Sequence, residues 1–137
     1  MTAGIEFSIL VETFTWLEGG DTERFFRSLG AAVEMADGQG GEVLLVDVCG
    51  FADLLAETRS RWPTVRRVDA VGLGYDDAKM KAAREARGAY VLYLDGDCLP
   101  LPGWKEAFLA RLRAGVPAVG GFTRYDGGDW AALESDR

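Results

Sequence analysis

Apolar runs of strand length alternate with helix-length segments along the 137-residue chain. Runs that mix aliphatic and aromatic residues, such as FSILV and YVLYL, are typical of strands buried on both faces. The expected strands are residues 5–12, 42–47, 65–71, 90–95 and 117–122. Because YVLYL carries large side chains on both faces, we expect residues 90–95 to take a central position in the sheet.

The segments between these strands carry apolar residues at helical spacing, together with residues that begin or end helices. The first expected helix opens at Asp21 or Thr22, either of which can cap it, and stops at Gly38. The other expected helices are residues 51–62, residues 76–87 with Asp76 and Asp77 as caps, and residues 102–113. Strands separated by single helices imply right-handed crossovers and a mostly parallel sheet. We therefore expect a three-layer α/β/α sandwich of the Rossmann-like kind.

The composition is that of one ordinary globular domain, spanning residues 1–137 with a polar tail at residues 125–137. Hydrophobic residues make up 48% and charged residues 27% of the chain. The net charge of −7 disfavours binding to nucleic acid or to an anionic membrane surface. No apolar run approaches the roughly 20 residues that a membrane span needs, and the N-terminus lacks the cationic start of a signal peptide. We therefore expect a cytoplasmic domain without a membrane span.

Histidine is absent, and cysteine occurs only as Cys49 and Cys98. The lack of histidine excludes catalytic triads that depend on it and metal sites with histidine ligands. Both cysteines follow apolar runs, so we expect reduced, buried thiols rather than a disulfide framework.

Polar and glycine residues follow the expected strands at the points where these strands end. Ligands of open parallel sheets bind at the carboxyl ends of the strands, so these residues form the candidate site. They are Glu12 and Thr13, Asp47, Gly72 and Gly74, and Asp95 with Asp97.

A DxD pattern alone carries little information, but Asp95-Gly96-Asp97 directly follows a strongly apolar strand. Two carboxylates at such a strand end repel each other unless a positive charge lies between them. Mg²⁺ or Mn²⁺ with an attached diphosphate would supply that charge, and Gly96 would allow a close approach of backbone or ligand. The alternative is a plain turn, in which Asp95 caps the next segment and Asp97 is solvated.

A basic helix precedes this strand, with Lys79 and Lys81 near its amino end. The two lysines could meet the phosphates of a nucleotide, helped by the positive end of the helix dipole. A solvated helix face is the alternative for them. Gly72 and Gly74 lack the spacing of a phosphate-binding motif and are more typical of a turn.

The run GLGYDDAKMKAAREARGAYVLYLDGDCLPLPGW, preceded by FSILVETFT and EVLLVD, resembles glycosyltransferase family 2, which has the GT-A fold. The order and spacing of these segments cover residues 5 to about 124. The resemblance implies a domain that binds a nucleotide diphosphate sugar, with a UDP-sugar expected, through Mn²⁺ or Mg²⁺. It also implies transfer of the sugar to an acceptor hydroxyl or amine.

The resemblance also implies roles for individual residues. The residues implied in nucleotide binding are Glu12, Thr13 and Phe14 at the nucleobase, Asp47 at the base or ribose, and Lys79 as the cation that contacts the nucleotide. Asp95 would meet the ribose or the water shell of the metal, and Asp97 would ligate the metal. Trp104 would lie near the sugar, although a role as a core residue of its helix is equally open.

The sequence departs from the family pattern at two places. Val48 replaces a second acidic residue after the second strand, and Met80 replaces an asparagine common after the helix-opening cation. No general base can be identified, since the acidic residues of the tail are expected to be solvated; these are Asp126, Asp129 and Glu134.

These departures leave open a donor-binding module without turnover, or half of an enzyme completed by a second chain or by a homo-oligomer. The sequence argues against two other classes of protein. A phosphate-signalling receiver would need an acidic pair after the first strand. A nucleotidyltransferase would need a glycine-rich loop there, and residues 12–16 contain no glycine.

Overall fold

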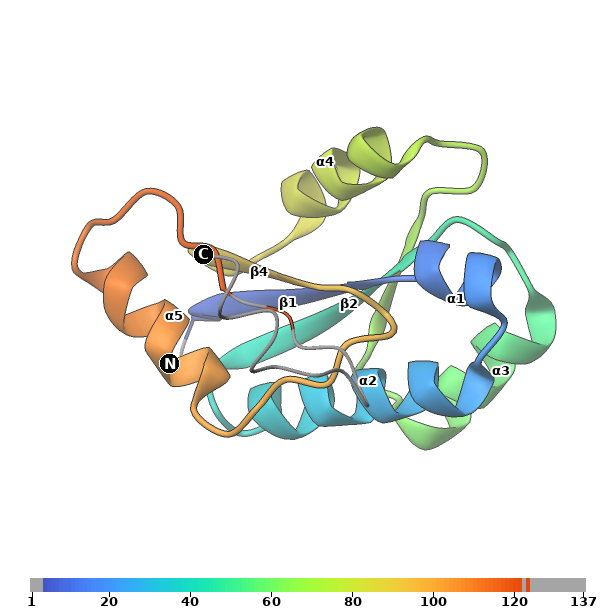
Figure 1. Ribbon diagram of the computed structural model, residues 1–137, viewed down its shortest axis with the longest axis horizontal. Helices are drawn as coiled ribbons and strands as arrows, with labels where there is room; N and C mark the ends of the chain where they lie inside the picture. Colours follow the sequence, from blue (N-terminus) through green and yellow to red (C-terminus); the bar gives the residue numbers. More distant parts are fainter. Residues whose placement is uncertain (1–3, 122, 124–137) are drawn as a thin grey trace, which may run out of the picture.

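The computed structural model describes residues 4–121 and 123. Its strands are β1 (Phe7–Glu12), β2 (Gly41–Asp47), β3 (Arg66–Asp69) and β4 (Tyr90–Leu94). They form one parallel sheet in the order β3-β2-β1-β4. Because all of these strands run in the same direction, their carboxyl ends meet at one edge of the sheet (Figure 1).

Helices cover both faces of this sheet (Figure 1). On one face lies α4 (Tyr75–Glu85); on the other lie α2 (Thr22–Ala36), α3 (Ala52–Arg61) and α5 (Trp104–Arg113). The short helix α1 (Phe14–Gly19) follows β1 at the carboxyl edge. The expected three-layer α/β/α architecture is confirmed. Within residues 4–121 and 123, no helix combines the length and the apolar character needed to cross a bilayer.

The sequence alternation within the strands explains why two helical layers form. In β1, Ile9 and Val11 join the core beneath α2, whereas Leu10 joins the core beneath α4. In β2, Leu45 and Leu44 divide in the same way. Since successive side chains of a strand point to opposite faces, a run that is apolar at every position buries both faces and needs helices on each side.

The longest helix, α2, begins and packs as its sequence predicts. Asp21 is its N-cap, and its carboxylate accepts a hydrogen bond from the backbone N–H of Arg24 at 3.0 Å. The apolar positions at helical spacing are all buried; they are Phe25, Leu29, Ala32, Val33 and Ala36.

The expected central position of residues 90–95 is wrong for the sheet that the structure describes. β4 pairs with β1 alone there and lies at the edge of the sheet, and Tyr93 is 43% exposed. The central strands are β1 and β2. The expectation was based on the large side chains on both faces of β4. One of them, Tyr93, lies against α4, where its hydroxyl donates to the carbonyl of Lys79 at 3.4 Å, and it remains partly exposed.

The expected strand at residues 117–122 is also wrong, because residues 117–121 form no strand. Pro117 cannot donate a backbone hydrogen bond, and Gly120 and Gly121 offer no side chain for packing, so little holds this segment against an edge strand. Phe122 and the polar tail at residues 125–137 lie outside the described residues.

Two helix starts differ from expectation. The helix α1 was not predicted, because its six residues are too few to show a helical period. The N-cap of α4 is Gly74, without a side-chain hydrogen bond, so Asp76 and Asp77 lie in the first turn and are not the caps.

Candidate functional site

Glu12 joins the end of β1 to the turn after β4. Its side chain is 2% exposed, and Oε1 accepts hydrogen bonds from the backbone N–H of Gly96 and from the hydroxyl of Thr15, both at 3.1 Å. Oε2 accepts from the backbone N–H of Thr15 at 3.2 Å. A Cβ atom on Gly96 would lie 2.3 Å from the carbonyl oxygen of Glu12. The expected close approach at Gly96 is thus an approach of backbone to backbone.

Thr13 joins the ends of β1 and β2. Its side chain is fully buried, and its hydroxyl accepts a hydrogen bond from the backbone N–H of Val48 at 3.0 Å. The backbone N–H of Thr13 donates to the carbonyl of Val46 at 3.2 Å. The contact of Glu12 and Thr13 with a nucleobase stays a prediction. In the structure both residues hold the loops that form the carboxyl edge.

Asp47 is fully buried at the end of β2, and both of its oxygens have partners. Oδ1 accepts from the backbone N–H groups of Cys49 and Gly50, both at 3.0 Å. Oδ2 lies 2.8 Å from Nε and from Nη2 of Arg67 on β3. The sequence analysis did not single out Arg67, because a cation on a short strand looks like a solvated side chain. The predicted contact of Asp47 with base or ribose is untested, and the carboxylate as it stands fixes the loop after β2.

Asp95, Asp97 and Cys98 bring potential ligand atoms to within 4.8 Å of one another. The turn that carries them is closed by a hydrogen bond of 3.0 Å from the N–H of Cys98 to the carbonyl of Asp95. Asp97 is exposed and Asp95 is half-buried. Carboxylate oxygens are the ligands that Mg²⁺ and Mn²⁺ prefer, so this pair fits the predicted cation.

Both cysteines are free and half-buried. The Cys98 thiol lies 3.6 Å from Oδ1 of Asp97. Burial, followed by the negative charges of Asp97 and Asp95, raises the pKa of Cys98 to about 11. Burial also raises the pKa of Cys49. In the absence of a metal, both thiols are therefore protonated at neutral pH. The expectation that they are buried is wrong, because both are half-buried.

Lys79 reaches from α4 to the same turn. Its Nζ donates to the hydroxyl of Tyr75 at 2.5 Å and lies 3.7 Å from Oδ1 of Asp95. The Tyr75 hydroxyl in turn donates to that Oδ1 at 3.0 Å. Nζ also lies 4.1 Å from the ring centre of Tyr75 and 5.1 Å from that of Tyr93. Lys79 therefore lies beside the end of β4, and its contact with a nucleotide stays a prediction.

Electrostatics favour the charged form of Lys79. Burial opposes the charge, but the hydrogen bond to Tyr75 and the negative charges of Asp95 and Glu12 outweigh it, so the pKa of Lys79 is raised. The sequence analysis missed Tyr75. Its position four residues before Lys79, on the same face of a helix, was the signal available.

The remaining predicted residues divide by position. Phe14 packs edge-on against Tyr75, with ring centres 5.3 Å apart. It therefore contacts the residue that hydrogen-bonds to both Lys79 and Asp95. Trp104 packs against Phe108 and the core beneath α2, as the core alternative predicts, and its contact with a sugar stays untested. Lys81 binds the backbone carbonyl of Asp69. Gly72 is a turn residue with φ of +83°.

The side chains of Val48 and Met80, the residues that depart from the family pattern, lie in different surroundings. Val48 packs against the core beneath α4, and Met80 is 51% exposed.

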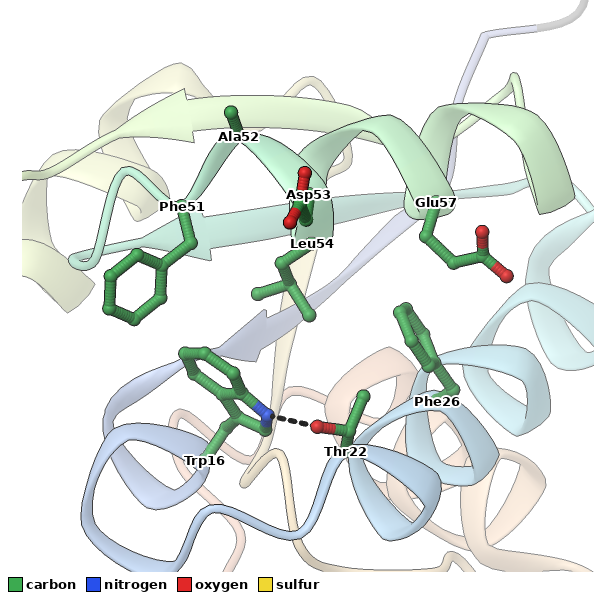
Figure 2. Close-up of a pocket in the computed structure, with 8 residues that line it drawn as sticks. All are labelled: Trp16, Thr22, Phe26, Phe51, Ala52, Asp53, Leu54 and Glu57. Atoms are coloured by element: carbon green, nitrogen blue, oxygen red, sulfur yellow. Dashed lines mark hydrogen bonds between the residues drawn. The ribbon is translucent and has the colours of Figure 1, made fainter.

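A separate cavity of about 510 Å³ lies between α1, α2 and α3. Figure 2 shows Trp16 and Phe51 on one side of it and Phe26 on the other, with Trp16 donating to the hydroxyl of Thr22 at 3.0 Å. Trp16 and Phe51 meet edge-on, with ring centres 5.2 Å apart. None of the predicted site residues lines this cavity. The predicted site is therefore the open carboxyl edge around Asp95, Asp97 and Lys79.

Comparison with known proteins shows the family and the fold of the chain. The model of the family described as "Glycosyl transferase family 2" matches residues 21–136. The chain belongs to glycosyl transferase family 2. Among solved structures, the chain is similar to residues 1–349 of TarS from S. aureus, with a TM-score of 0.60 and 18% sequence identity.

The chain spans well under half the length of the TarS chain that it matches. The match covers 86% of this chain and 38% of the TarS chain. At this identity the likeness shows the fold, and the fold is that of the GT-A glycosyltransferases. No curated protein gave a significant sequence match.

Proposed function

We propose that this glycosyl transferase family 2 chain binds a nucleotide diphosphate sugar at the carboxyl edge of its sheet and takes part in the transfer of the sugar to an acceptor. The expected donor is a UDP-sugar, and the expected cofactor is Mn²⁺ or Mg²⁺ held by Asp97 and Asp95. The observation that carries this proposal is that Asp95 lies close to Asp97 and also to the Lys79 ammonium at the strand ends.

The residues divide into those that would touch the donor and those that hold them in place. Asp97, Asp95 and Lys79 are accessible or half-buried and carry the charges that a metal–diphosphate pair requires. Phe14 and Tyr75 supply ring surface beside them. By contrast, the buried residues position the loops through hydrogen bonds that are already complete; they are Glu12, Thr13 and Asp47.

When bound, the divalent cation would neutralise the diphosphate as it leaves the sugar. Asp97 and Asp95 would hold the cation, and Lys79 would place a further positive charge on the phosphates. Both contributions stabilise charge that develops on the leaving group, which is the electrostatic part of glycosyl transfer.

Calorimetric titration tests the binding proposal. UDP is titrated into the native protein with and without Mn²⁺, and GDP provides a comparison of bases. The expected result is binding of UDP that needs Mn²⁺ and weakens at least tenfold in Asp97→Asn. Asp77→Asn, which neutralises an exposed carboxylate in the first turn of α4, is the matched control and should keep native affinity. Equal heats for the native protein and Asp97→Asn would refute the site.

The same proteins distinguish an enzyme from a donor-binding module. A transferase with Mn²⁺ passes the sugar of a UDP-sugar to water or to an acceptor hydroxyl or amine and releases UDP, and Asp97→Asn abolishes that release. A module that only binds donor retains UDP and Mn²⁺ but releases no UDP from the sugar nucleotide at any enzyme concentration.

A further inference from the structure

Lys79 occupies the position of a counter-ion to one of the two proposed metal ligands. Its Nζ lies 3.7 Å from Oδ1 of Asp95, and the Tyr75 hydroxyl joins the two groups by hydrogen bonds to each. Both interactions are made with the same carboxylate oxygen. The Lys79 side chain is 22% exposed, so its charge is only partly screened by water.

A divalent cation bound between Asp95 and Asp97 would meet this ammonium at close range. Two positive charges near one carboxylate oxygen repel each other, and Lys79 already provides much of the neutralisation that the carboxylate pair needs. A diphosphate beside the cation would reverse this effect, because Lys79 could then leave Asp95 and pair with a phosphate oxygen.

We propose that Lys79 is an internal substitute for the metal, which pairs with Asp95 while no nucleotide is bound and moves to the diphosphate when the donor arrives. This inference rests on the proposed function and adds to it the order in which the cation and the nucleotide bind. The cation binds weakly on its own and tightly with the nucleotide, so free metal does not fill the site without donor.

The surroundings of Lys79 suit a side chain with two positions. Its Nζ lies over the rings of Tyr75 and Tyr93, and a cation is attracted to an aromatic face whichever anion it pairs with. Lys79 can therefore exchange its anionic partner while its charge remains supported. Lysine suits this exchange because its ammonium is a compact charge on a flexible stem.

The decisive measurement is the affinity for Mn²⁺ alone, by titration followed with electron paramagnetic resonance. Removing a unit charge near a divalent ion should tighten Mn²⁺ binding roughly fivefold or more in Lys79→Met and in Lys79→Gln. Lys81→Met is the matched control, since it removes the same charge from the same helix but from a lysine that binds the Asp69 carbonyl. Its Mn²⁺ affinity should stay within about twofold of native.

Unchanged or weaker Mn²⁺ binding in both Lys79 variants would overturn the inference, as would an equal gain in Lys81→Met. Circular dichroism of each variant establishes that the fold is retained. Binding of Mn²⁺ to none of these proteins in the absence of nucleotide would overturn this inference alone, because the proposed function requires only that Mn²⁺ binds together with UDP.

A second arm measures the coupling between metal and nucleotide. In the native protein UDP should raise Mn²⁺ affinity, and by linkage Mn²⁺ should raise UDP affinity by the same factor. Lys79→Met should lower that factor, because there is no ammonium to transfer from Asp95 to the phosphates. A coupling factor equal to the native one would contradict the exchange.

The two arms separate the two proposals. Failure of UDP to bind the native protein with Mn²⁺ would refute the proposed function, whereas the comparison of Mn²⁺ affinities without nucleotide would still decide the role of Lys79.

Discussion

Gly96 is the residue on which the position of both candidate metal ligands depends. A Cβ atom there would meet the Glu12 carbonyl oxygen at 2.3 Å and the ring of Phe25 at 3.0 Å. The backbone of β1 cannot move aside, because β1 lies between β2 and β4 and pairs with both. The DxD spacing at this turn therefore reflects a packing requirement between the two aspartates as well as their chemistry.

Gly96→Ala should destabilise the protein by about 1–3 kcal/mol, the usual range for a side chain forced into a filled space. It should also weaken Mn²⁺ binding, since the turn must shift away from Glu12 and separate Asp95 from Asp97. Urea denaturation measures the first effect and Mn²⁺ titration the second.

Gly19→Ala is the control for this change, because a Cβ atom at Gly19 has nothing within 4 Å. Its stability should be neutral or slightly higher, as replacing glycine at an open helical position restricts the unfolded chain. Native stability in Gly96→Ala would show that the turn can relax without loss, against the geometry described above.

At the scale of elements, Glu42 joins the amino end of β2 to the amino ends of β1, β3 and β4. Its carboxylate accepts from the Ser8 hydroxyl on β1 at 2.7 Å and from Arg66 on β3 at 3.0 Å. It also accepts from the backbone N–H of Arg87, just before β4, at 2.7 Å. Glu12 connects β1 to the turn after β4 at the carboxyl edge in the same way. A carboxylate therefore links neighbouring strands at each end of the sheet.

Glu42→Gln should cost about 1–2 kcal/mol at pH 7, because hydrogen bonds to a charged group are lost or weakened. Burial opposes the charge of Glu42, but its hydrogen bonds to Ser8, Arg87 and Arg66 outweigh burial and lower its pKa below 4.5. A lowered pKa in the folded state means that this stabilisation is complete above pH 4.5 and is lost as the pH falls through the folded value.

The measurement is the free energy of unfolding of both proteins by urea at pH 7 and at several values below 4.5. The difference between native protein and Glu42→Gln should shrink toward zero as the pH falls. Glu57→Gln is the control, since its carboxylate pairs with Arg61 on an exposed helix face and its loss should change stability little at any pH. A constant difference across the pH range would contradict the role of the Glu42 charge.

The success of sequence reasoning differs between elements for physical reasons. β1 and β2 were predicted because apolar residues at every position require burial on two faces, and α2 because its cap and its period agree. The position of β4 was wrong, since large side chains such as Tyr93 look alike whether they face a core or cover the side of a helix. The prediction of a strand at residues 117–121 was wrong because a short apolar run does not form a strand without a partner for its backbone.

The candidate site was predicted to a similar extent. The sequence placed Asp95, Asp97 and the amino end of the Lys79 helix at the carboxyl ends of the strands, since parallel strands and the helices between them bring their ends to one edge. The pairing of Lys79 with Asp95 was not predicted. Side-chain connections across that edge could not be predicted, because they depend on rotamers and on distances between elements. Tyr75 and Arg67 are the two residues missed for this reason, and each proves to join a predicted carboxylate to its neighbours.

At the scale of the whole molecule, the proposed site should work against folding when no metal is present. Asp95 and Asp97 place two like charges in one turn of a protein whose net charge is already −7. Lys79 offsets only the first of them. A turn arranged for a divalent ion is therefore expected to be less stable without that ion than a neutral variant of the same shape.

Asp97→Asn separates stability from binding by the sign of its effect. Without metal, the variant should be as stable as the native protein or more stable by about 0.5 kcal/mol, because one repulsion is removed. With free Mn²⁺ at about 100 times the native Kd, the native protein should gain about 2.7 kcal/mol and Asp97→Asn much less, so the order of stability reverses. Thermal unfolding with Mn²⁺ and with a chelator measures both states, and Asp77→Asn should follow the native protein in each. A variant that is less stable than native in chelator, and that gains as much from Mn²⁺, would mean that Asp97 serves the fold and not a cation.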